Sequence, residues 1–371
     1  MNSLIDQVRN IILRNRMIEP GDKVLTAVSG GADSVSLIHG LFELKDELKF
    51  NLCIAHLNHQ ARGKDSDKDA QFVRRLGESL GVETILDSID ARKESEILKT
   101  SFQEGARILR YRFLESAMKK CKGNKIAVGH NADDSVETVL INLLRGSGMK
   151  GLSGIPPVRG NIIRPLLTCS RLEIEDFLKS RQLTYRCDCT NAETDYLRNK
   201  IRLDLIPKLE NEYSRNIKSH ILNTAEIIRE EDDYLDNLEW LRAYLRKNGN
   251  DCTLEQEKVR RLHPAMRRRV VRLAIAEVLG SLRRITVQHV DDVLKLVGDP
   301  WPGKQAHLPE FLVVSCNEKE LVFSIKPKPS AGILKLGDSG EGLIELNIPG
   351  VTKIPSASLS LRTQVVPGGE Y

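Results

Sequence analysis

A glycine turn flanked by hydroxyl and carboxyl side chains carries the clearest chemical signal in the sequence. The segment reads Val28-Ser29-Gly30-Gly31-Ala32-Asp33-Ser34, between an expected strand and an expected helix. Its glycines let the backbone approach an anion, and the amides at the helix start, helped by the serine hydroxyls, suit a phosphate. Asp33 would repel a bare phosphate, so its presence suggests a bridging Mg²⁺, which prefers oxygen ligands. A plain β-turn before a helix is the alternative, but strand, SGGxDS and helix together favour a phosphate site.

A second cluster combines a histidine with three carboxylates. It reads Gly129-His130-Asn131-Ala132-Asp133-Asp134-Ser135-Val136-Glu137. If Asn131 opens a helix, Asp134 and Glu137 share one face of it and Asp133 adjoins them. Beside a phosphate loop, such acids could gather Mg²⁺ or accept a proton from an amine. Acids near a helix start also favour its macrodipole, which explains one or two of them but less easily the whole cluster, so we interpret it as functional.

Both clusters follow strands in a region of alternating strand and helix patterns. We expect strands over 23–28, 52–57, 83–87 and 125–128, and helices over 34–48, 65–80 and 102–120. This alternation predicts an α/β fold with a parallel sheet. In such sheets ligands bind beyond the carboxyl ends of the strands, where both clusters would lie.

The remainder of the chain shows different sequence patterns. Helical patterns cover 216–247, 264–279 and 286–297, a hairpin is expected with its turn near Asn317-Glu318, and short alternating strands follow. We therefore divide the chain into a catalytic domain (1–212), a helical middle domain ending in the hairpin (213–325) and a short β-rich C-terminal domain or fragment (326–371). Between Arg260 and Arg284 there are eight arginines and one acid, Glu277. This segregation suggests a basic face for a polyanion, although a solvated helix surface explains it equally well.

Composition narrows the class of protein. The chain has 371 residues, 40% of them hydrophobic, which suits two or three globular domains. No apolar run approaches the ~20 residues needed to cross a bilayer, and the first residues read as an ordinary helix without a signal-peptide core. Seven scattered cysteines make a disulfide framework unexpected. We expect a cytoplasmic protein with no membrane association.

Taken in order, the motifs resemble those of a known family. SGGxDS after a strand resembles the PP-loop signature of enzymes that split ATP into AMP and pyrophosphate. Further motifs are His56-Leu-Asn-His59-Gln-Ala-Arg62, Glu104–Tyr111, Gly129–Thr138, Arg145–Gly154, Arg164–Leu167, Asp188–Asn191 and Arg198–Arg202. The series is similar to the catalytic domain of the tRNA(Ile)-lysidine synthetases. The resemblance covers about two-thirds of the chain with dense motifs, and more loosely the middle domain through Ile325.

The resemblance implies a substrate, a reaction and a set of site residues. The reaction would join L-lysine to C2 of the first anticodon cytidine in the minor isoleucine tRNA with a CAU anticodon, through an O-adenylated cytidine, with ATP and Mg²⁺. The implied nucleotide-binding residues are Ser29, Gly30, Gly31, Ala32, Asp33, Ser34, His56 and His130. The implied catalytic residues are Asp33, Asp134, Glu137, Arg198 and Arg202, with Asp33 and Asp134 as Mg²⁺ ligands. The implied tRNA contacts are Arg107, Arg110, Arg267, Arg268, Arg269 and Arg272.

The resemblance also assigns roles. The ε-amine of lysine, with an ordinary pKa of ~10.4, must lose a proton before it attacks, and Asp134 and Glu137 are the candidates to receive it. Arg198 or Arg202 would stabilise the adenylated intermediate or the lysine carboxylate. A homodimer is compatible with the resemblance but not required by it.

Three other readings are weighed against this one. A PP-loop tRNA thiolase usually supplies Cys-x-x-Cys pairs, and this sequence has none, only Cys187-Asp-Cys189. A small-metabolite ligase of the argininosuccinate or GMP synthetase type does not account for the basic helical module. A non-catalytic tRNA-binding protein does not account for the intact Asp33, Asp134 and Glu137.

Overall fold

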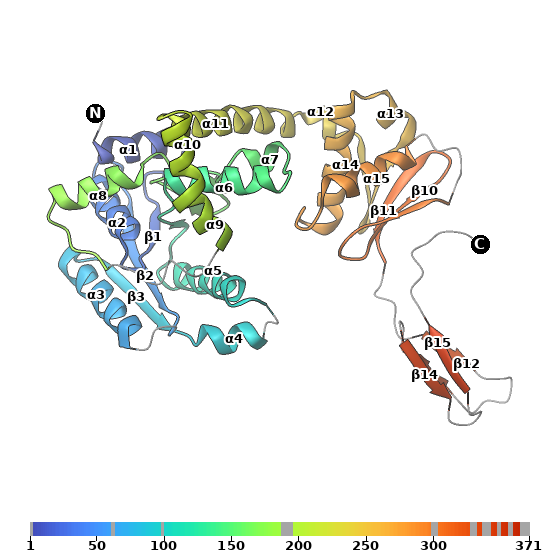
Figure 1. Cartoon of the computed structure of the whole chain (residues 1–371), viewed down its shortest axis with the longest axis horizontal. Coiled ribbons are helices and arrows are strands. Elements are labelled where there is room, and N and C mark those ends of the chain that lie inside the picture. The colour runs from blue at the N-terminus through green and yellow to red at the C-terminus, as the bar shows by residue number, and fades with distance from the viewer. Residues whose placement is uncertain are drawn as a thin grey trace. The chain divides into compact units, whose positions relative to one another are not determined.

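A computed structural model describes residues 3–60, 64–97, 100–186, 196–297 and 303–326, and the backbone of four short strands beyond them. The chain forms two units, Met1–Asp233 and Tyr234–Tyr371 (Figure 1). Each is described by itself below. Among the described residues, no helix combines the length and apolar character needed to cross a membrane.

The first unit is built on a six-stranded sheet in the order β3-β2-β1-β4-β6-β5. Its strands are β1 (Lys23–Ala27), β2 (Asn51–Asn58), β3 (Glu83–Ser88), β4 (Lys125–Ala127), β5 (Val158–Arg159) and β6 (Ile162–Ile163). Neighbouring strands run parallel except for the edge strand β5, which is antiparallel to β6. The four predicted strands are all present, and the expectation of a parallel α/β sheet is confirmed.

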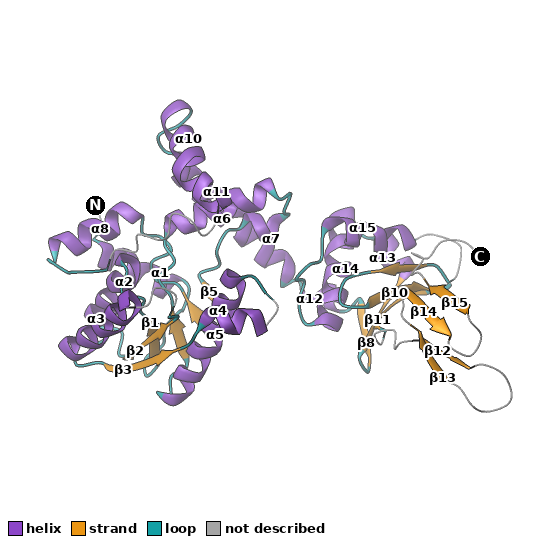
Figure 2. Ribbon diagram, turned by 60° about the horizontal axis from the view of Figure 1, so that its bottom comes forward, coloured by secondary structure: helices purple, strands orange, loops and turns teal. Residues whose placement is uncertain are grey.

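Helices cover both faces of this sheet. They are α1 (Leu4–Arg14), α2 (Ala32–Leu44), α3 (Lys64–Leu80), α4 (Ala91–Ile97), α5 (Phe102–Lys120), α6 (Ala132–Leu144), α7 (Met149–Leu152) and α8 (Arg171–Ser180). Figures 1 and 2 show β1–β3 between α2 and α3 on one side and α5 on the other. Alternate residues of the central strands accordingly enter different cores: Val24 and Ile54 pack with α2, whereas Leu25 and Cys53 pack with α5. Burial on both faces explains why these strands read as unbroken apolar runs.

A helical segment completes the first unit. It comprises α9 (Tyr196–Lys200), a π-helical turn η2 (Ile201–Leu205), α10 (Ile206–Glu212) and most of α11 (Ile217–Asp236). Ile201 and Ile206 pack against Val136 and Leu140 of α6. Pro207, at the start of α10, has no amide hydrogen for a regular helical bond, which accounts for the irregular turn before it.

The second unit joins helices to a five-stranded antiparallel sheet in the order β7-β8-β11-β10-β9. Its helices are α12 (Glu239–Arg242), α13 (Gln256–Arg261), α14 (Pro264–Leu279) and α15 (Val287–Leu296). Its strands are β7 (Leu245–Asn248), β8 (Asp251–Glu255), β9 (Gln305–His307), β10 (Leu312–Cys316) and β11 (Glu320–Ile325). The helices predicted over 264–279 and 286–297 and the hairpin around Asn317 are confirmed.

The helix predicted over 216–247 is partly wrong. Helix α11 ends at Asp236 and the short helix α12 covers Glu239–Arg242, but the residues from Leu245 form strand β7, which pairs with β8 through a tight turn at Gly249. Gly249 has φ +61, which suits the first loop residue of a two-residue Gly-Asn hairpin turn that the helical periodicity hid. Pairing of β8 with β11 brings this hairpin into the sheet, and only tertiary contact could supply that constraint.

The last part of the chain contains two antiparallel strand pairs. β12 (Gly332–Lys335) pairs with β13 (Leu343–Leu346), and β14 (Gly350–Ile354) pairs with β15 (Leu359–Thr363). The short strands expected beyond residue 326 are therefore present.

Replacing Leu41 with alanine tests the core between α2 and the sheet. Leu41 is 0% exposed within that core, so we expect L41A to lower the free energy of unfolding by about 2–5 kcal/mol in urea titrations. The control is Leu13→Ala on α1, where the side chain is 56% exposed and the change should stay within about 0.5 kcal/mol. Equal effects of the two substitutions would contradict this packing.

Candidate active site

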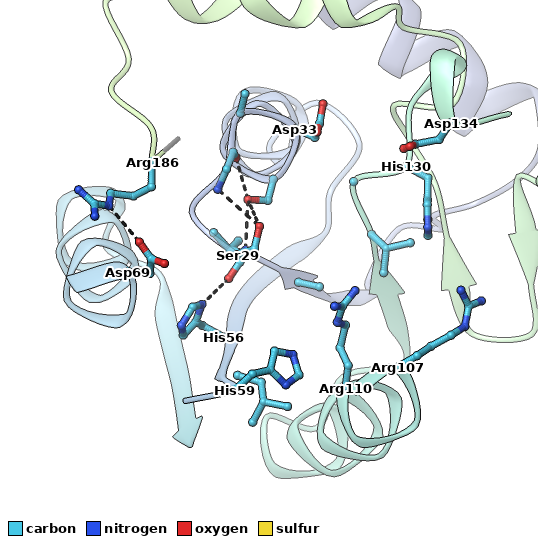
Figure 3. A pocket seen from close by; sticks show the side chains of 18 of the residues that line it. Ser29, Asp33, His56, His59, Asp69, Arg107, Arg110, His130, Asp134 and Arg186 are labelled. Carbon is cyan, nitrogen blue, oxygen red and sulfur yellow. Dashed lines mark hydrogen bonds and ion pairs between the residues drawn. The ribbon is translucent and has the colours of Figure 1, made fainter. Parts of the chain in front are cut away.

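The glycine turn joins β1 to α2 and is ordered by one of its own serines. Gly30 has φ +93, a conformation that favours glycine. The Ser34 hydroxyl accepts from the amides of Ser29 and Gly30, both at 3.2 Å, and donates to the Gly31 carbonyl at 2.9 Å (Figure 3). Ser34 is thus committed to the loop itself, a role that the sequence did not reveal.

The start of α2 differs from the starts of four other helices in this unit. Helices α1, α5, α6 and α8 each begin with a side chain that caps a backbone amide: Ser3, Ser101, Asn131 and Ser170. The N-cap of α2 is Gly31, which has no side chain to offer. Because the first amides of a helix lack intrahelical acceptors, those of α2 are suited to bind an anion.

The turn forms one wall of a pocket of about 640 Å³ at the carboxyl ends of the parallel strands. This is where the sequence placed the site, and the size suits a nucleotide. The acidic, basic and histidine residues that line it are Asp33, Asp69, Asp134, His56, His59, His130, Arg107, Arg110, Arg171, Arg186, Arg198 and Arg202. Apolar lining residues include Leu57, Phe113, Leu114 and Val128. The loop and the helix start of α6 lie close together, since a Cβ on Gly129 would come within 3.3 Å of the Asp33 backbone.

Three histidines present neutral imidazoles to this pocket. His56 Nδ1 lies 2.8 Å from the Val28 carbonyl, which can only accept, so Nδ1 carries the hydrogen and Nε2 is an acceptor. Burial lowers the pKa of His56, and burial together with nearby arginines lowers the pKa of His59 and of His130 to about 4. His56 Nε2, His59 Nδ1 and His130 Nδ1 are buried without a partner among the described residues. They suit hydrogen bonds to an uncharged part of a nucleotide (Figure 3).

The carboxylates near the loop do not converge on one point. Asp33 accepts from Asn131 Nδ2 at 3.0 Å and from Arg171 Nη1 at 2.8 Å. Asp133 turns instead toward the Arg171 amide, at 2.8 Å, and Lys218 Nζ, at 3.0 Å. Within the described ranges no three histidine, cysteine or acidic side chains are grouped as a metal site. Three acids, Asp33, Asp69 and Asp134, line the pocket, and Asp69 pairs with Arg186. The carboxylates of Asp33 and Asp134 together with phosphate oxygens fit the ligand needs of Mg²⁺.

Asp134 has two roles at the start of α6. Its Oδ2 accepts from the Asn131 amide at 3.2 Å, and its own amide donates to Asn131 Oδ1 at 3.0 Å, forming a capping box. Burial raises the pKa of Asp134 to about 6, although the Asn131 hydrogen bond opposes the rise. The macrodipole alternative therefore explains part of the acidic cluster, while the elevated pKa suits a group that accepts a proton near neutral pH.

Glu137 is buried beneath two arginines. Its side chain is 1% exposed, and its oxygens accept from Arg198 Nε at 2.9 Å and Arg202 Nε at 2.5 Å. Arg202 Nη2 also lies 3.5 Å from Asp134 Oδ1. Glu137 therefore holds Arg198 and Arg202 against α6, and it is these arginines, with Asp134, that line the pocket.

The structure adds residues that the motifs did not single out. Arg171 pairs with Asp33. The sequence signal that could have found it is a basic residue in the first turn of a helix, where its charge opposes the helix dipole. Arg186 donates its amide to the Gly30 carbonyl at 2.9 Å and pairs with Asp69 on α3, also at 2.9 Å. No local pattern marked Arg186, because its role depends on a loop 156 positions earlier in the chain.

The arginines expected to contact tRNA fall into two groups. Arg107 and Arg110 line the pocket in the first unit. Arg267, Arg268, Arg269 and Arg272 lie on α14 in the second unit. Arg268 pairs with Asp291, Arg267 donates to the Leu262 carbonyl, and Arg269, 12% exposed, pairs with Asp236. The motif residues Arg62 and Asp188–Asn191 lie outside the described residues.

Two family models match this chain. Residues 3–209 match the PP-loop domain, and residues 254–320 match the TilS substrate binding domain. A tRNA(Ile)-lysidine synthase from Caldanaerobacter subterraneus is 39% identical over 81% of this chain and 65% of that relative. One from Clostridioides difficile is 33% identical over 96% of this chain and 80% of the relative. The chain belongs to the tRNA(Ile)-lysidine synthase family.

A solved structure agrees with part of the fold of this family member. The U34-tRNA thiolase NcsA from Methanococcus maripaludis, with its [4Fe-4S] cluster, superposes with a TM-score of 0.51 at 23% identity. The match covers 61% of this chain and 78% of the thiolase. At that identity the similarity concerns the PP-loop fold alone, so it gives no support to the thiolase alternative.

Replacing Glu137 with alanine would leave Arg198 and Arg202 close together without their shared counter-charge. We expect E137A to lower the free energy of unfolding by about 2 kcal/mol, less than for a fully buried pair because both arginines are partly exposed. Urea titration measures it. The control, Asp204→Ala on the neighbouring η2, removes an exposed acid and should change stability by less than about 0.5 kcal/mol. An E137A protein as stable as D204A would show that this ion-pair group does not hold η2 to α6.

Proposed function

We propose that this chain joins L-lysine to C2 of the first anticodon cytidine in the isoleucine tRNA with a CAU anticodon, cleaving ATP to AMP and pyrophosphate. Family membership indicates the reaction class. The observation that carries the proposal is a single pocket in which the uncapped start of α2 adjoins Asp33 and the elevated-pKa Asp134. An ATP- and tRNA-dependent reaction of this kind belongs in the cytoplasm.

The first step activates a poor leaving group. The cytidine O2 attacks the α-phosphorus of ATP, so that an O–P bond forms and the bond to the diphosphate breaks. The amides at the start of α2, with the Ser29 hydroxyl beside them, hold the departing diphosphate. The neutral imidazoles of His56 and His130 bind uncharged polar atoms of the nucleotide.

The second step replaces the activated oxygen with an amine. The lysine ε-ammonium binds Asp134, which takes one proton from it. The neutral amine then attacks C2, a C–N bond forms, and the C2–O bond breaks as AMP leaves with that oxygen. A pKa of about 6 makes Asp134 a stronger base than an ordinary aspartate near 3.9. Arg198 and Arg202 bind the phosphate of the adenylated base or the lysine carboxylate, and Glu137 positions both arginines.

Mg²⁺ would be held by Asp33 and Asp134. Mg²⁺ is usually bound by one or two carboxylates together with substrate phosphates, and when bound it neutralises phosphate charge. Asp33 is the better ligand of the two, because Asp134 is also needed as the proton acceptor. The pairing of Asp33 with Arg171 keeps its carboxylate oriented at the pocket.

The target cytidine must leave its stack to enter the pocket. Arg107 and Arg110, which line the pocket on α5, would contact the extruded nucleotide or its phosphate. The arginines of α14 would contact tRNA phosphates elsewhere on the molecule.

The reaction is tested with labelled lysine, ATP and a transcript of the CAU isoleucine tRNA. We expect label to enter that RNA but not a methionine tRNA with the same anticodon. Asp134→Asn, which keeps the shape but cannot accept the proton, should lower the rate about 100-fold or more. Label in neither RNA with the wild-type protein, despite ATP cleavage, would contradict the proposed acceptor.

The pH dependence of the same reaction tests whether Asp134 acts as the proton acceptor. Above a pKa of about 6 Asp134 is ionised and can accept the proton, and below it the neutral carboxyl cannot, so the rate should fall as pH drops through about 6. The residual activity of Asp134→Asn should not show this fall in rate at low pH. If the rate of the variant falls over the same pH range as that of the wild type, the titrating group is not Asp134.

Charge reversal on α14 tests the contribution of the second unit to tRNA binding. We expect Arg268→Glu and Arg272→Glu each to weaken tRNA affinity and to reduce the slope of log K against log salt by about one. Arg269 is left unchanged because it is mostly buried with Asp236. Lys295→Glu on α15 is the control, and equal losses from all three variants would indicate only a net-charge effect.

A further inference from the structure

Arg171 is the first residue of α8 and lies beside the glycine turn. Ser170 caps the helix, and the Arg171 side chain extends to the pocket, where Nη1 donates to Asp33 at 2.8 Å and Nε donates to Glu175 at 2.7 Å. About two-fifths of the side chain remains exposed, 42% by area. The residue was not among those that the motifs indicated.

A cation is electrostatically misplaced at a helix N-terminus. The helix dipole disfavours it there, and the first turn of α8 already contains Glu173, the acid of its capping box. The position is nevertheless fixed from outside the helix, because Asp133 accepts the Arg171 amide at 2.8 Å while Asp33 accepts the guanidinium. Two acids from the first turns of separate helices thus hold in place a residue whose charge α8 itself does not favour, which indicates a role at the pocket.

The guanidinium has donors left for a ligand. It carries five N–H groups, and its hydrogen bonds to Glu175 and Asp33 within the described part of the chain account for two of them. The remaining groups lie next to Asp33, the second residue of α2, and so next to the uncapped amides. Pairing with Arg171 also offsets the Asp33 charge, which would otherwise repel an approaching phosphate.

We propose that Arg171 binds the diphosphate portion of the nucleotide, completing the anion site of the glycine turn from a neighbouring helix. The inference rests on the proposed function and extends it to a residue outside the loop. No bond to Arg171 forms or breaks; its N–H groups donate to non-bridging oxygens and stabilise the negative charge that grows on the leaving diphosphate. Arg186 supports the same loop differently, through its backbone bond to Gly30 and its pairing with Asp69.

Binding of inorganic pyrophosphate and of AMP, measured separately by calorimetry, tests this assignment. We expect Arg171→Gln to weaken pyrophosphate binding about tenfold or more while AMP binding changes less than about twofold. Arg171→Lys should retain part of the affinity, since it keeps the positive charge but loses the planar guanidinium and its paired N–H donors. The matched control is Arg181→Gln at the other end of α8, where an exposed arginine pairs with Glu43 at 3.0 Å; it should bind both ligands as the wild type does.

Several outcomes would overturn the assignment. Equal pyrophosphate affinities of wild type, R171Q and R171K would show that Arg171 is not a ligand. Parallel losses for AMP and pyrophosphate, or a melting temperature well below that of R181Q, would assign it a structural role instead. Wild-type protein that binds no pyrophosphate would also reject the site. Because these titrations need neither lysine nor tRNA, their result is independent of whether the proposed ligation occurs.

Discussion

A helix that begins without a capping side chain is the feature on which the site depends. Gly31 has no side chain to accept hydrogen bonds from the first amides of α2. The positive φ of Gly30 lets the chain turn from β1 into the start of that helix. Unpaired amides at a helix start favour an anion, which is why this turn suits a phosphate group. The Ser34 hydroxyl meanwhile satisfies the preceding amides, which keeps the turn in shape.

Around this helix start, acids pair with arginines that are distant in the sequence. Asp33 pairs with Arg171, Asp69 with Arg186, and Glu137 with Arg198 and Arg202. Each pair joins an element of the early part of the sheet domain to a later helix or loop, so the pairs fix the pocket walls relative to one another. They also place cations where phosphate and carboxylate groups of substrates would bind, while keeping the protein's own acids from repelling those groups.

The two carboxylates predicted to act together are separated by their environments. Asp134 stays at the pocket, where burial raises its pKa to about 6, whereas Glu137 lies 1% exposed under two cations. One face of one helix therefore presents a carboxylate at the pocket and, one turn later, a buried carboxylate that anchors two arginines. The arginines of α14 also differ in their environments. Arg269 is largely buried and pairs with Asp236, whereas Arg268 remains half exposed.

The sequence by itself determined the sheet, the turn and the position of the site. Unbroken apolar strands, glycines at a strand-to-helix junction and a cap at Asn131 are local signals, because backbone conformation and burial on two faces depend on nearby residue types. The partners of the charged groups were decided only by tertiary structure. The pairing of Asp33 with Arg171 spans 138 positions, and the hairpin at Gly249 became part of a sheet only when β8 met β11. Long-range ion pairs and strand pairing depend on which elements pack together, and no periodicity along the chain records that.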